Sequence, residues 1–282
     1  MTTTGTDSGR FRLGTRGSRL ALTQSGQVAE ALMAAGGGGA AAAAGKASEG
    51  SGGLGIDLVT VRTDGDGDRT PLRQLGGVGV FAARLRHALL DGEVDLVVHS
   101  FKDLPTQPVE GLEVICVPAR EDPRDALCAR DGLTLADLPE GARVGTGSPR
   151  RAAQLLAARP NLEVVDLRGN VPTRLARVRG LEVVGVGTDE PVAPSRADAA
   201  GDLDAVVLAL SGLRRLGLEH CASEVLDLET MLPAPAQGAL AVEARAGEDS
   251  AELARAVAVL DDEPTRLAVT AERALMARLG AG

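Results

Sequence analysis

The stretch that decides the fold class is VDLVVHSFKDLP at residues 94–105. It begins with an apolar run, which is typical of a strand that is buried on both faces. Polar and charged residues follow at the point where this strand ends: His99, Ser100, Lys102 and Asp103. Ligands of α/β proteins bind at the carboxyl ends of strands, so this turn is a candidate site, with a solvated turn of no function as the alternative.

Apolar runs and helical periodicity alternate on both sides of this stretch. The order strand, helix, strand, helix predicts parallel pairing and an α/β fold. Ser18 is the predicted N-cap of the first helix. We expect strands at 11–15, 56–61, 94–98, 112–117, 143–145, 162–167 and 204–208, and helices at 19–34, 81–90, 148–158 and 171–178.

The alternating pattern occurs twice, which predicts two α/β units joined by two crossings of the chain. One crossing is expected near 118–123 and a second near 232–237, where prolines interrupt the pattern. A strand at 239–243 would then return to the first unit. Two crossings are typical of a pair of periplasmic-binding-protein-like lobes. Two segments rich in small and polar residues, 36–55 and 191–201, are interpreted as flexible insertions.

The composition excludes several classes of protein. The formal net charge is −9, and the chain has three Phe and neither Tyr nor Trp. An acidic chain without stacking aromatic rings is a poor candidate for nucleic-acid binding. No apolar stretch is long enough to span a bilayer and no signal peptide is evident, so we expect no membrane association. Three cysteines without metal-ligand spacing favour a reducing cytoplasm: Cys116, Cys128 and Cys221.

Arginines recur where predicted strands end. Residues 146–151, TGSPRR, combine a hydroxyl-rich turn with a helix start, where Ser148 is the predicted N-cap. Backbone N–H groups at such a start favour an anion, whereas Arg150 and Arg151 oppose the helix dipole and have no local stabilising reason. We therefore interpret these residues as anion-binding, with two solvated arginines as the alternative.

A second turn of this kind contains Arg168, Gly169 and Asn170, followed by Arg174 on the same helical face. Gly169 permits close approach of the backbone to a ligand. Arg16 follows the first predicted strand. Arginines at several separate strand ends, in a chain of net negative charge, predict a cleft for a polycarboxylate, because Arg grips carboxylates in bidentate geometry.

Nine segments, in this order and spacing, resemble the hydroxymethylbilane synthase (porphobilinogen deaminase) family. They are LGTRGS at 13–18, GGVGVF at 76–81, VHSFKDLP at 98–105, REDPRD at 120–125, VGTGSPRR at 144–151, LRGN at 167–170, GLRRLG at 212–217, LPAPAQG at 232–238 and TAER at 270–273. Each segment alone is a weak signal, but all of them in order are very specific. Together they extend over nearly the whole chain.

The resemblance implies a three-domain transferase with its active site between the first two domains. Four porphobilinogen units would be joined stepwise, each losing ammonia, into the linear tetrapyrrole hydroxymethylbilane of haem biosynthesis. A dipyrromethane cofactor, made from two substrate units, would be thioether-linked to a cysteine of the third domain. Asp103 matches the catalytic aspartate, whose carboxylate would bind pyrrole N–H groups and stabilise the cationic azafulvene formed on deamination.

The resemblance and the strand-end positions together predict which residues bind the acetate and propionate groups of cofactor and substrate. They are Arg16, Ser18, Ser100, Lys102, Thr146, Ser148, Arg150, Arg151, Arg168, Gly169, Asn170, Arg174 and Gln237. No metal site is expected, and porphobilinogen is the expected partner of a cytoplasmic monomer.

The expected fold is α/β, with two lobes joined by a double crossover and the first helix of a third α+β domain. Domain 1 is expected at 1–119 with a return segment at 237–261, domain 2 at 120–236, and a remnant of domain 3 at 262–282, with a helix at 264–279. Residues 272–282 match the segment leading to the attachment cysteine, so we expect the chain as given to be inactive without it. An inactive truncated copy and a two-lobed anion-binding protein without catalysis are the alternatives. Ala236 stands where a glycine is common in the family.

Overall fold

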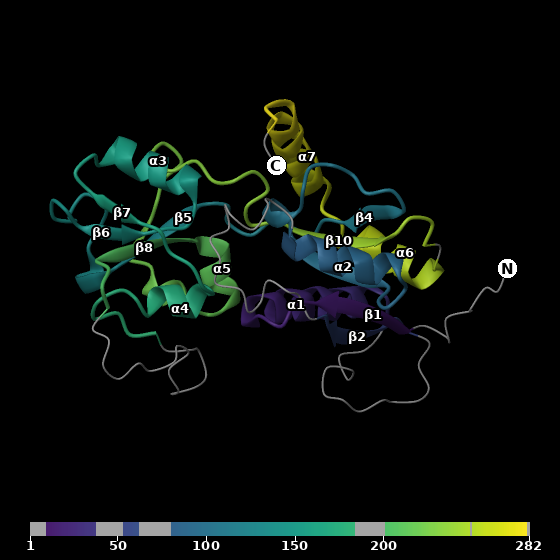
Figure 1. Ribbon diagram of the computed structural model, residues 1–282. Helices are drawn as coiled ribbons and strands as arrows, with labels where there is room; N and C mark the ends of the chain where they lie inside the picture. Colours follow the sequence, from purple (N-terminus) through teal and green to yellow (C-terminus); the bar gives the residue numbers. More distant parts are fainter. Residues whose placement is uncertain (1–9, 38–52, 62–79, 184–200, 249, 281–282) are drawn as a thin grey trace. The chain divides into compact units, whose positions relative to one another are not determined.

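A computed structural model describes residues 10–37, 53–61, 80–183, 201–248 and 250–280 (Figure 1). The chain divides into two compact units, Met1–Arg120 with Ala239–Gly282 (unit 1) and Glu121–Gly238 (unit 2). Each unit has its own five-stranded sheet. The predicted α/β fold with two units and two crossings is thereby confirmed. Most of the two predicted insertions, residues 38–52 and 191–200, lies outside the described residues.

The sheet of unit 1 has the strand order β2-β1-β3-β10-β4. Its central strand β3 is flanked by β1, which runs parallel to it, and by β10, which runs antiparallel. The strands are β1 (Arg10–Thr15), β2 (Gly55–Thr60), β3 (Leu96–Ser100), β4 (Leu112–Cys116) and β10 (Leu240–Arg245). β3 is buried on both faces, because Leu96 and Val98 pack in one core cluster and Val97 in another. The apolar run within residues 94–98 therefore lies at the centre of unit 1.

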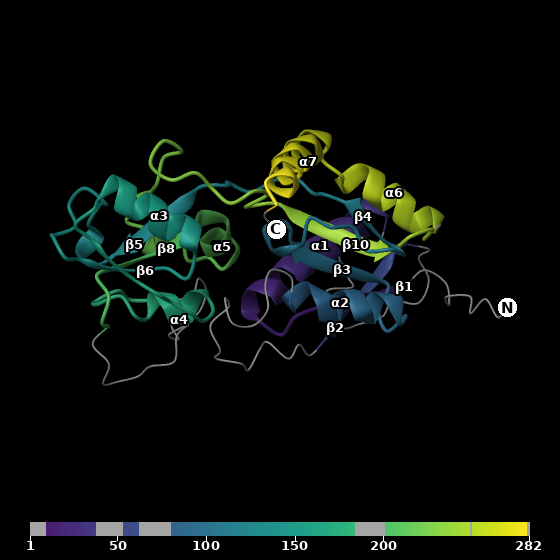
Figure 2. The ribbon, with the colours of Figure 1, turned by 45° about the horizontal axis from the view of Figure 1, so that its top comes forward.

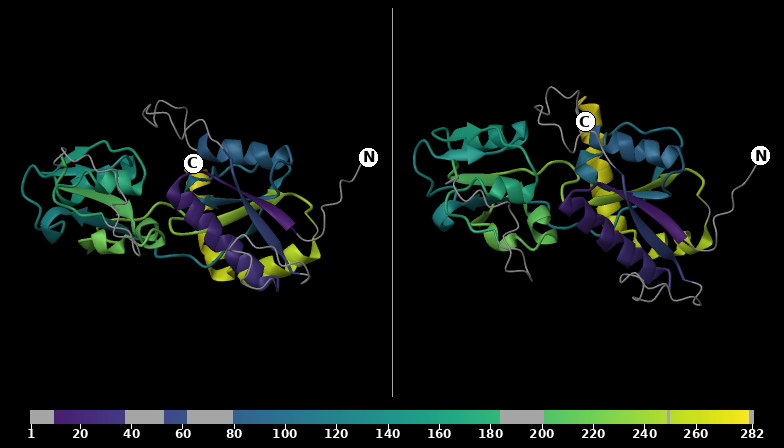
Figure 3. Two further views of the ribbon diagram at one scale, coloured as in Figure 1. Left: turned by 90° about the horizontal axis from the view of Figure 1, so that it is seen from below. Right: turned by 60° about the horizontal axis from the view of Figure 1, so that its bottom comes forward.

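Helices cover both faces of this sheet. The unit contains α1 (Arg19–Ala35), α2 (Val80–Leu90), α6 (Ala251–Leu260) and α7 (Glu263–Arg278). Residues of α1 and α6, including Leu32 and Leu253, share a core cluster with Leu96, whereas Leu89 of α2 packs with Val97. Accordingly, α1 and α6 lie on one side of the sheet and α2 on the other (Figures 2 and 3).

Unit 2 repeats this arrangement with the strand order β7-β6-β8-β5-β9. β6 runs parallel to both β7 and β8, and β5 runs antiparallel to β8. The strands are β5 (Asp125–Ala129), β6 (Arg143–Gly145), β7 (Glu163–Val165), β8 (Ala205–Ala209) and β9 (Glu224–Val225). The helices are α3 (Pro149–Ala158), α4 (Val171–Leu175) and α5 (Leu210–Arg215), with α3 and α4 on opposite sides of the sheet (Figure 1).

In each unit the antiparallel strand is the one that follows a crossing of the chain. β5 follows the first crossing and β10 the second. The two crossing segments lie side by side, since the Glu121 amide donates to the Gly238 carbonyl at 3.3 Å. Gly238 has a φ of +91°, and a Cβ there would lie 2.3 Å from the Glu121 carbonyl oxygen. This contact therefore requires glycine.

The predicted parallel pairing is confirmed for β1, β2 and β3 and for β6, β7 and β8. It is wrong for β4, which pairs antiparallel with β10. The neighbour of β4 is a strand that returns after the whole of unit 2, so the local order of elements does not decide the direction of pairing. Helices α5 and α6 were not expected. The assignment of residues 262–282 to a third domain stays a prediction.

Candidate functional site

Asp103 lies in a short 3₁₀ turn, Phe101–Asp103, that begins directly after β3. The side chains of Phe101 and Leu104 on either side of it are buried, 7% and 1% exposed, whereas Asp103 is exposed and Lys102 half-buried. The turn is therefore anchored by its apolar residues and presents the carboxylate to solvent. This is the end of the strand at which the sequence predicted a site.

Arg16 and Ser18 follow β1, the parallel neighbour of β3. Because parallel strands end at the same edge of a sheet, these residues and the Asp103 turn leave the sheet at one edge. The predicted N-cap is confirmed, since the Ser18 hydroxyl accepts from the Ala21 amide at 3.3 Å. Ser100 lies against α1, where its hydroxyl is 3.1 Å from the Gln24 amide nitrogen.

Unit 2 places a second group of predicted residues where β6 and β7 end. Ser148 is confirmed as the N-cap of α3 and accepts from the Arg151 amide at 3.5 Å. The Thr146 hydroxyl accepts from the Ser148 amide at 3.2 Å, so the turn is closed by its own hydroxyl groups. A Cβ at Gly147 would lie 2.6 Å from the Leu167 carbonyl oxygen, which shows how closely this turn approaches the next one.

The next turn contains the remaining residues of this group. Asn170 is the N-cap of α4 and accepts from the Thr173 amide at 2.9 Å. Gly169 has a φ of +110°, and its carbonyl accepts from the Arg174 Nε at 2.6 Å. Nη2 of Arg168 is buried and has no hydrogen-bond partner among the described residues. A buried guanidinium donor without a partner is costly, so this nitrogen is suited to an anionic ligand.

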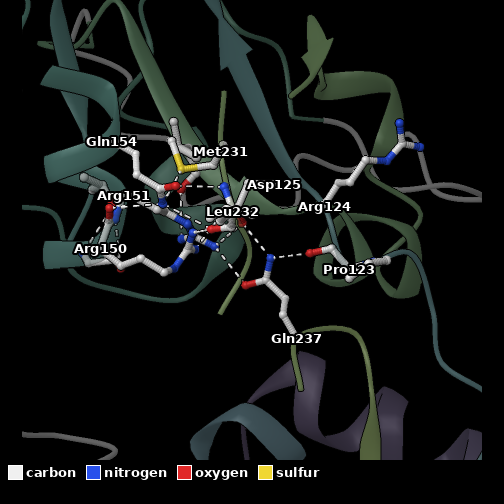
Figure 4. A network of polar contacts seen from close by, with 12 residues as sticks. Pro123, Arg124, Asp125, Arg150, Arg151, Gln154, Met231, Leu232 and Gln237 are labelled. Atoms are coloured by element: carbon white, nitrogen blue, oxygen red, sulfur yellow. Dashed lines mark hydrogen bonds and ion pairs between the residues drawn. The ribbon is translucent and has the colours of Figure 1, made fainter. Parts of the chain in front are cut away.

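Arg150 and Arg151 converge on one buried carboxylate, that of Asp125 at the start of β5 (Figure 4). Nη2 of Arg150 lies 2.6 Å from one carboxylate oxygen of Asp125, and Nη2 of Arg151 lies 2.7 Å from the other. Gln237 donates to the same carboxylate at 2.8 Å and to the Pro123 carbonyl at 2.7 Å. We call these four residues, Asp125, Arg150, Arg151 and Gln237, the Asp125 cluster.

The members of the Asp125 cluster are removed from solvent to different degrees. Asp125 and Gln237 are 0% exposed and Arg151 is 7% exposed. The alternative of two solvated arginines is therefore wrong for Arg151. Burial alone would raise the pKa of the Asp125 carboxyl, but the guanidinium groups of Arg151 and Arg150 outweigh it and hold that pKa below its ordinary value. The carboxylate of Asp125 is therefore an internal anion that the side chains of Arg150 and Arg151 already bind.

Sequence reasoning missed Asp125, although it lies in the quoted segment at 120–125. Two adjacent arginines begin this helix, and one of them faces the core. A buried arginine needs a carboxylate as its partner, and this need was the available signal for Asp125. The assignment of Arg150, Arg151 and Gln237 to cofactor binding stays a prediction.

A second buried ionic group lies in unit 1 and was also not expected. Glu243 of β10 accepts from Arg86 of α2 at 2.8 Å, and Nε2 of His99 lies 3.2 Å from its other oxygen. Burial would raise the pKa of Glu243, but hydrogen bonds from His99 and Arg86 hold it below its ordinary value. His99, 6% exposed, is thus a packed strand-end residue.

The three cysteines are free and buried. Burial raises the pKa of the Cys116 thiol to about 12, and it also raises the pKa values of Cys128 and Cys221. Such thiols are protonated at neutral pH and are poor nucleophiles. Within the described ranges, no group of three His, Cys, Asp or Glu residues is arranged to hold a metal ion. No helix in the described part of the chain is long and apolar enough to cross a bilayer.

The sequence matches one family model over residues 11–253, that of "Porphobilinogen deaminase, dipyromethane cofactor binding domain". The chain belongs to the porphobilinogen deaminase family. It is 54% identical to the porphobilinogen deaminase of Micrococcus luteus, over 96% of this chain and 70% of that protein. It is also 54% identical to the porphobilinogen deaminase of Cutibacterium acnes, over 96% of this chain and 74% of that protein.

Among solved structures, the chain is similar to the methionine-binding protein MetQ. The TM-score is 0.48 at 15% sequence identity, over 95% of this chain and 96% of that chain.

Proposed function

We propose that the chain provides the catalytic site of a hydroxymethylbilane synthase, which works when a cysteine-linked dipyrromethane cofactor is present. Asp103 is its catalytic carboxylate, and the arginine-bearing turns are its carboxylate-binding sites. Family membership supports the reaction, in which porphobilinogen units are joined with loss of ammonia. The observation that carries the role of Asp103 is its position. It is an exposed carboxylate on a turn whose neighbouring side chains are buried. It follows the end of β3 at the same edge of the sheet at which Arg16 follows the end of β1.

The position of Asp103 suits the charge that develops in this reaction. The amino nitrogen is protonated before it leaves. When the C–N bond of this ammonium group breaks, its electron pair leaves with nitrogen as ammonia, and the positive charge remains on the substrate carbon and pyrrole ring. A carboxylate fixed beside the ring accepts a hydrogen bond from the pyrrole N–H and stabilises this charge. The substrate excludes water from the carboxylate when it binds, and the attraction is then stronger than in solvent.

The residues present also fit a dipyrromethane cofactor with carboxylate side chains. This cofactor, when bound, supplies the pyrrole to which the first substrate unit is joined. Nη2 of Arg168 is a buried donor without a hydrogen-bond partner among the described residues, and it is therefore well suited to bind a carboxylate of the cofactor. Arg16, Lys102 and Arg174 add cationic side chains at the same two sheet edges.

The side chains that cap helices can also bind a ligand. Ser18 and Ser148 each use an oxygen lone pair to cap a helix, and each hydroxyl proton stays available to a ligand carboxylate. Thr146, Ser100, Gly169 and Asn170 complete the proposed set at the turns.

The experiment that tests the role of Asp103 compares Asp103→Asn with Glu110→Gln in the holoenzyme, that is, this chain joined to the segment that carries the cofactor on its cysteine. Asparagine keeps the shape and removes the charge, so kcat for porphobilinogen consumption should fall about 10²–10³-fold. Glu110 is an exposed carboxylate of the same unit, and its replacement should leave kcat unchanged. Far-UV circular dichroism confirms that both variants are folded. An Asp103→Asn variant within about tenfold of the unmodified enzyme contradicts the assignment.

We further propose that the protein is a monomer in the cytoplasm. Three free thiols support a reducing compartment. Sedimentation equilibrium of the purified protein measures the mass in solution, and a stable dimer would contradict the proposed monomer.

A further inference from the structure

We propose that Arg273 of α7 is a positioning residue that holds the Asp103 turn in its working orientation. The proposal rests on the proposed function of Asp103 and extends it to a residue that lies 170 positions later in the chain. Arg273 lies in the TAER segment at 270–273, and no role for it was predicted from the sequence.

The guanidinium of Arg273 binds the main chain of the turn on both sides of Asp103. Nη1 donates to the carbonyl of Phe101 at 3.2 Å and to that of Leu104 at 2.7 Å. Nη2 donates to the carbonyl of Pro105 at 2.7 Å. The guanidinium carbon also lies 4.5 Å from the centre of the Phe101 ring, within cation–π distance. One planar group thus fixes three carbonyls and a ring.

The buried side chains of Phe101 and Leu104 and two main-chain hydrogen bonds also hold the turn. The Phe101 amide donates to the Ala239 carbonyl at 3.1 Å, and the Leu104 amide closes the turn on Phe101 at 3.3 Å. Ser100, at the position before the turn, makes no side-chain capping hydrogen bond. Asp103 itself is exposed, and the backbone that Arg273 binds sets the point from which its side chain leaves the turn.

The position of Arg273 is costly for a cation. Burial and the nearby Arg86 lower the pKa of Arg273, and Glu243 opposes this shift. A guanidinium that remains charged there needs acceptors, and the carbonyls of the turn are those acceptors. Only arginine presents several donors in one rigid plane, so lysine cannot bind all three carbonyls at once.

The competing explanation is that Arg273 merely attaches α7 to unit 1. Arg266, on the same helix two turns earlier, provides the comparison. Its guanidinium also donates to main-chain carbonyls, those of Val114 at 3.3 Å and Ile115 at 3.1 Å, but these belong to β4. Arg266 also forms an ion pair with Asp261. These bonds attach α7 to β4 and to the end of α6 and do not reach the Asp103 turn, so Arg266→Lys is the control for loss of helix attachment.

The experiment measures amide hydrogen exchange and steady-state kinetics of Arg273→Lys and Arg266→Lys in the holoenzyme. For Arg273→Lys we expect exchange in a peptide covering 101–106 to rise about tenfold or more, with a peptide covering 112–117 unchanged. We expect kcat to fall about 10–100-fold with little change in KM, because a displaced carboxylate loses its alignment with the substrate. Arg266→Lys should show the opposite pattern, faster exchange at 112–117 and an unchanged kcat.

Exchange at 101–106 within about twofold of the unmodified enzyme overturns the proposal. Equal losses of kcat in the two variants overturn it as well, because helix attachment alone would then explain both. If Arg273→Lys does not fold, Arg273→Gln repeats the test with the charge removed and one donor group kept. If Asp103→Asn retains its kcat, the catalytic assignment fails, and the exchange measurement still decides whether Arg273 holds the turn.

Discussion

Replacing Asp125 by asparagine should destabilise unit 2 by about 3–5 kcal/mol, the usual cost of breaking a buried ion pair from one side. The carboxylate accepts hydrogen bonds of 2.6, 2.7 and 2.8 Å from Arg150, Arg151 and Gln237. All three are charge-assisted because the acceptor is ionised, and the two from arginines are also ion pairs; each such bond contributes about 1.5–3 kcal/mol. Asparagine keeps one acceptor but turns an NH2 group toward a guanidinium, and Arg151 remains buried without a counter-charge.

The assay is urea unfolding followed by far-UV circular dichroism, because the chain has no Trp or Tyr to report by fluorescence. Glu163→Gln is the matched control in the same unit. Glu163 pairs with Arg143 at 3.3 Å, but its side chain is 59% exposed, so its loss should cost less than about 1 kcal/mol. A loss of unfolding free energy below about 1 kcal/mol for Asp125→Asn would show that this buried carboxylate stabilises unit 2 no more than an exposed ion pair does.

The pH dependence gives a second measure of the same cluster. The folded-state pKa of Asp125 lies below its ordinary value of 3.8, so its stabilisation is fully present above that pH. It is lost as the pH falls through the folded-state pKa. The difference in unfolding free energy between the unmodified protein and Asp125→Asn should therefore be constant near neutral pH and shrink below about pH 4. A difference that persists at the lowest pH where the protein folds would contradict this linkage.

Two substitutions that introduce or remove glycine test backbone strain at Ala236 and close packing at Gly147. Ala236 has a φ of +59°, so Ala236→Gly should relieve strain and raise the unfolding free energy by about 1 kcal/mol; an unchanged urea midpoint would count against strain there. At Gly147 a Cβ would lie 2.6 Å from the Leu167 carbonyl oxygen, so Gly147→Ala should cost about 1–3 kcal/mol. Gly26→Ala in α1, where a Cβ meets nothing within 4 Å, is its control and should be neutral or slightly stabilising; equal effects of the two would exclude the steric explanation.

Local structure and the positions of the polar turns could be predicted from the sequence alone. β3 lies within two residues of its predicted bounds, and Ser18 and Ser148 cap the helices that they were expected to cap. Such features depend on residues within about four positions of one another, where periodicity and capping chemistry act directly. The position of Asp103 after β3 follows from the same local pattern.

The tertiary structure alone decided which distant groups meet. Arg151 and Asp125 are 26 residues apart, His99 and Glu243 are 144 apart, and Arg273 lies 168–172 residues from the carbonyls that it binds. The partner with which β4 pairs was likewise decided by β10, which returns after the second crossing and separates β4 from β3 in the sheet. A buried charge requires a partner of opposite charge, but the sequence does not show which residue that partner is. The packing of strands and helices from separate parts of the chain selects the partner.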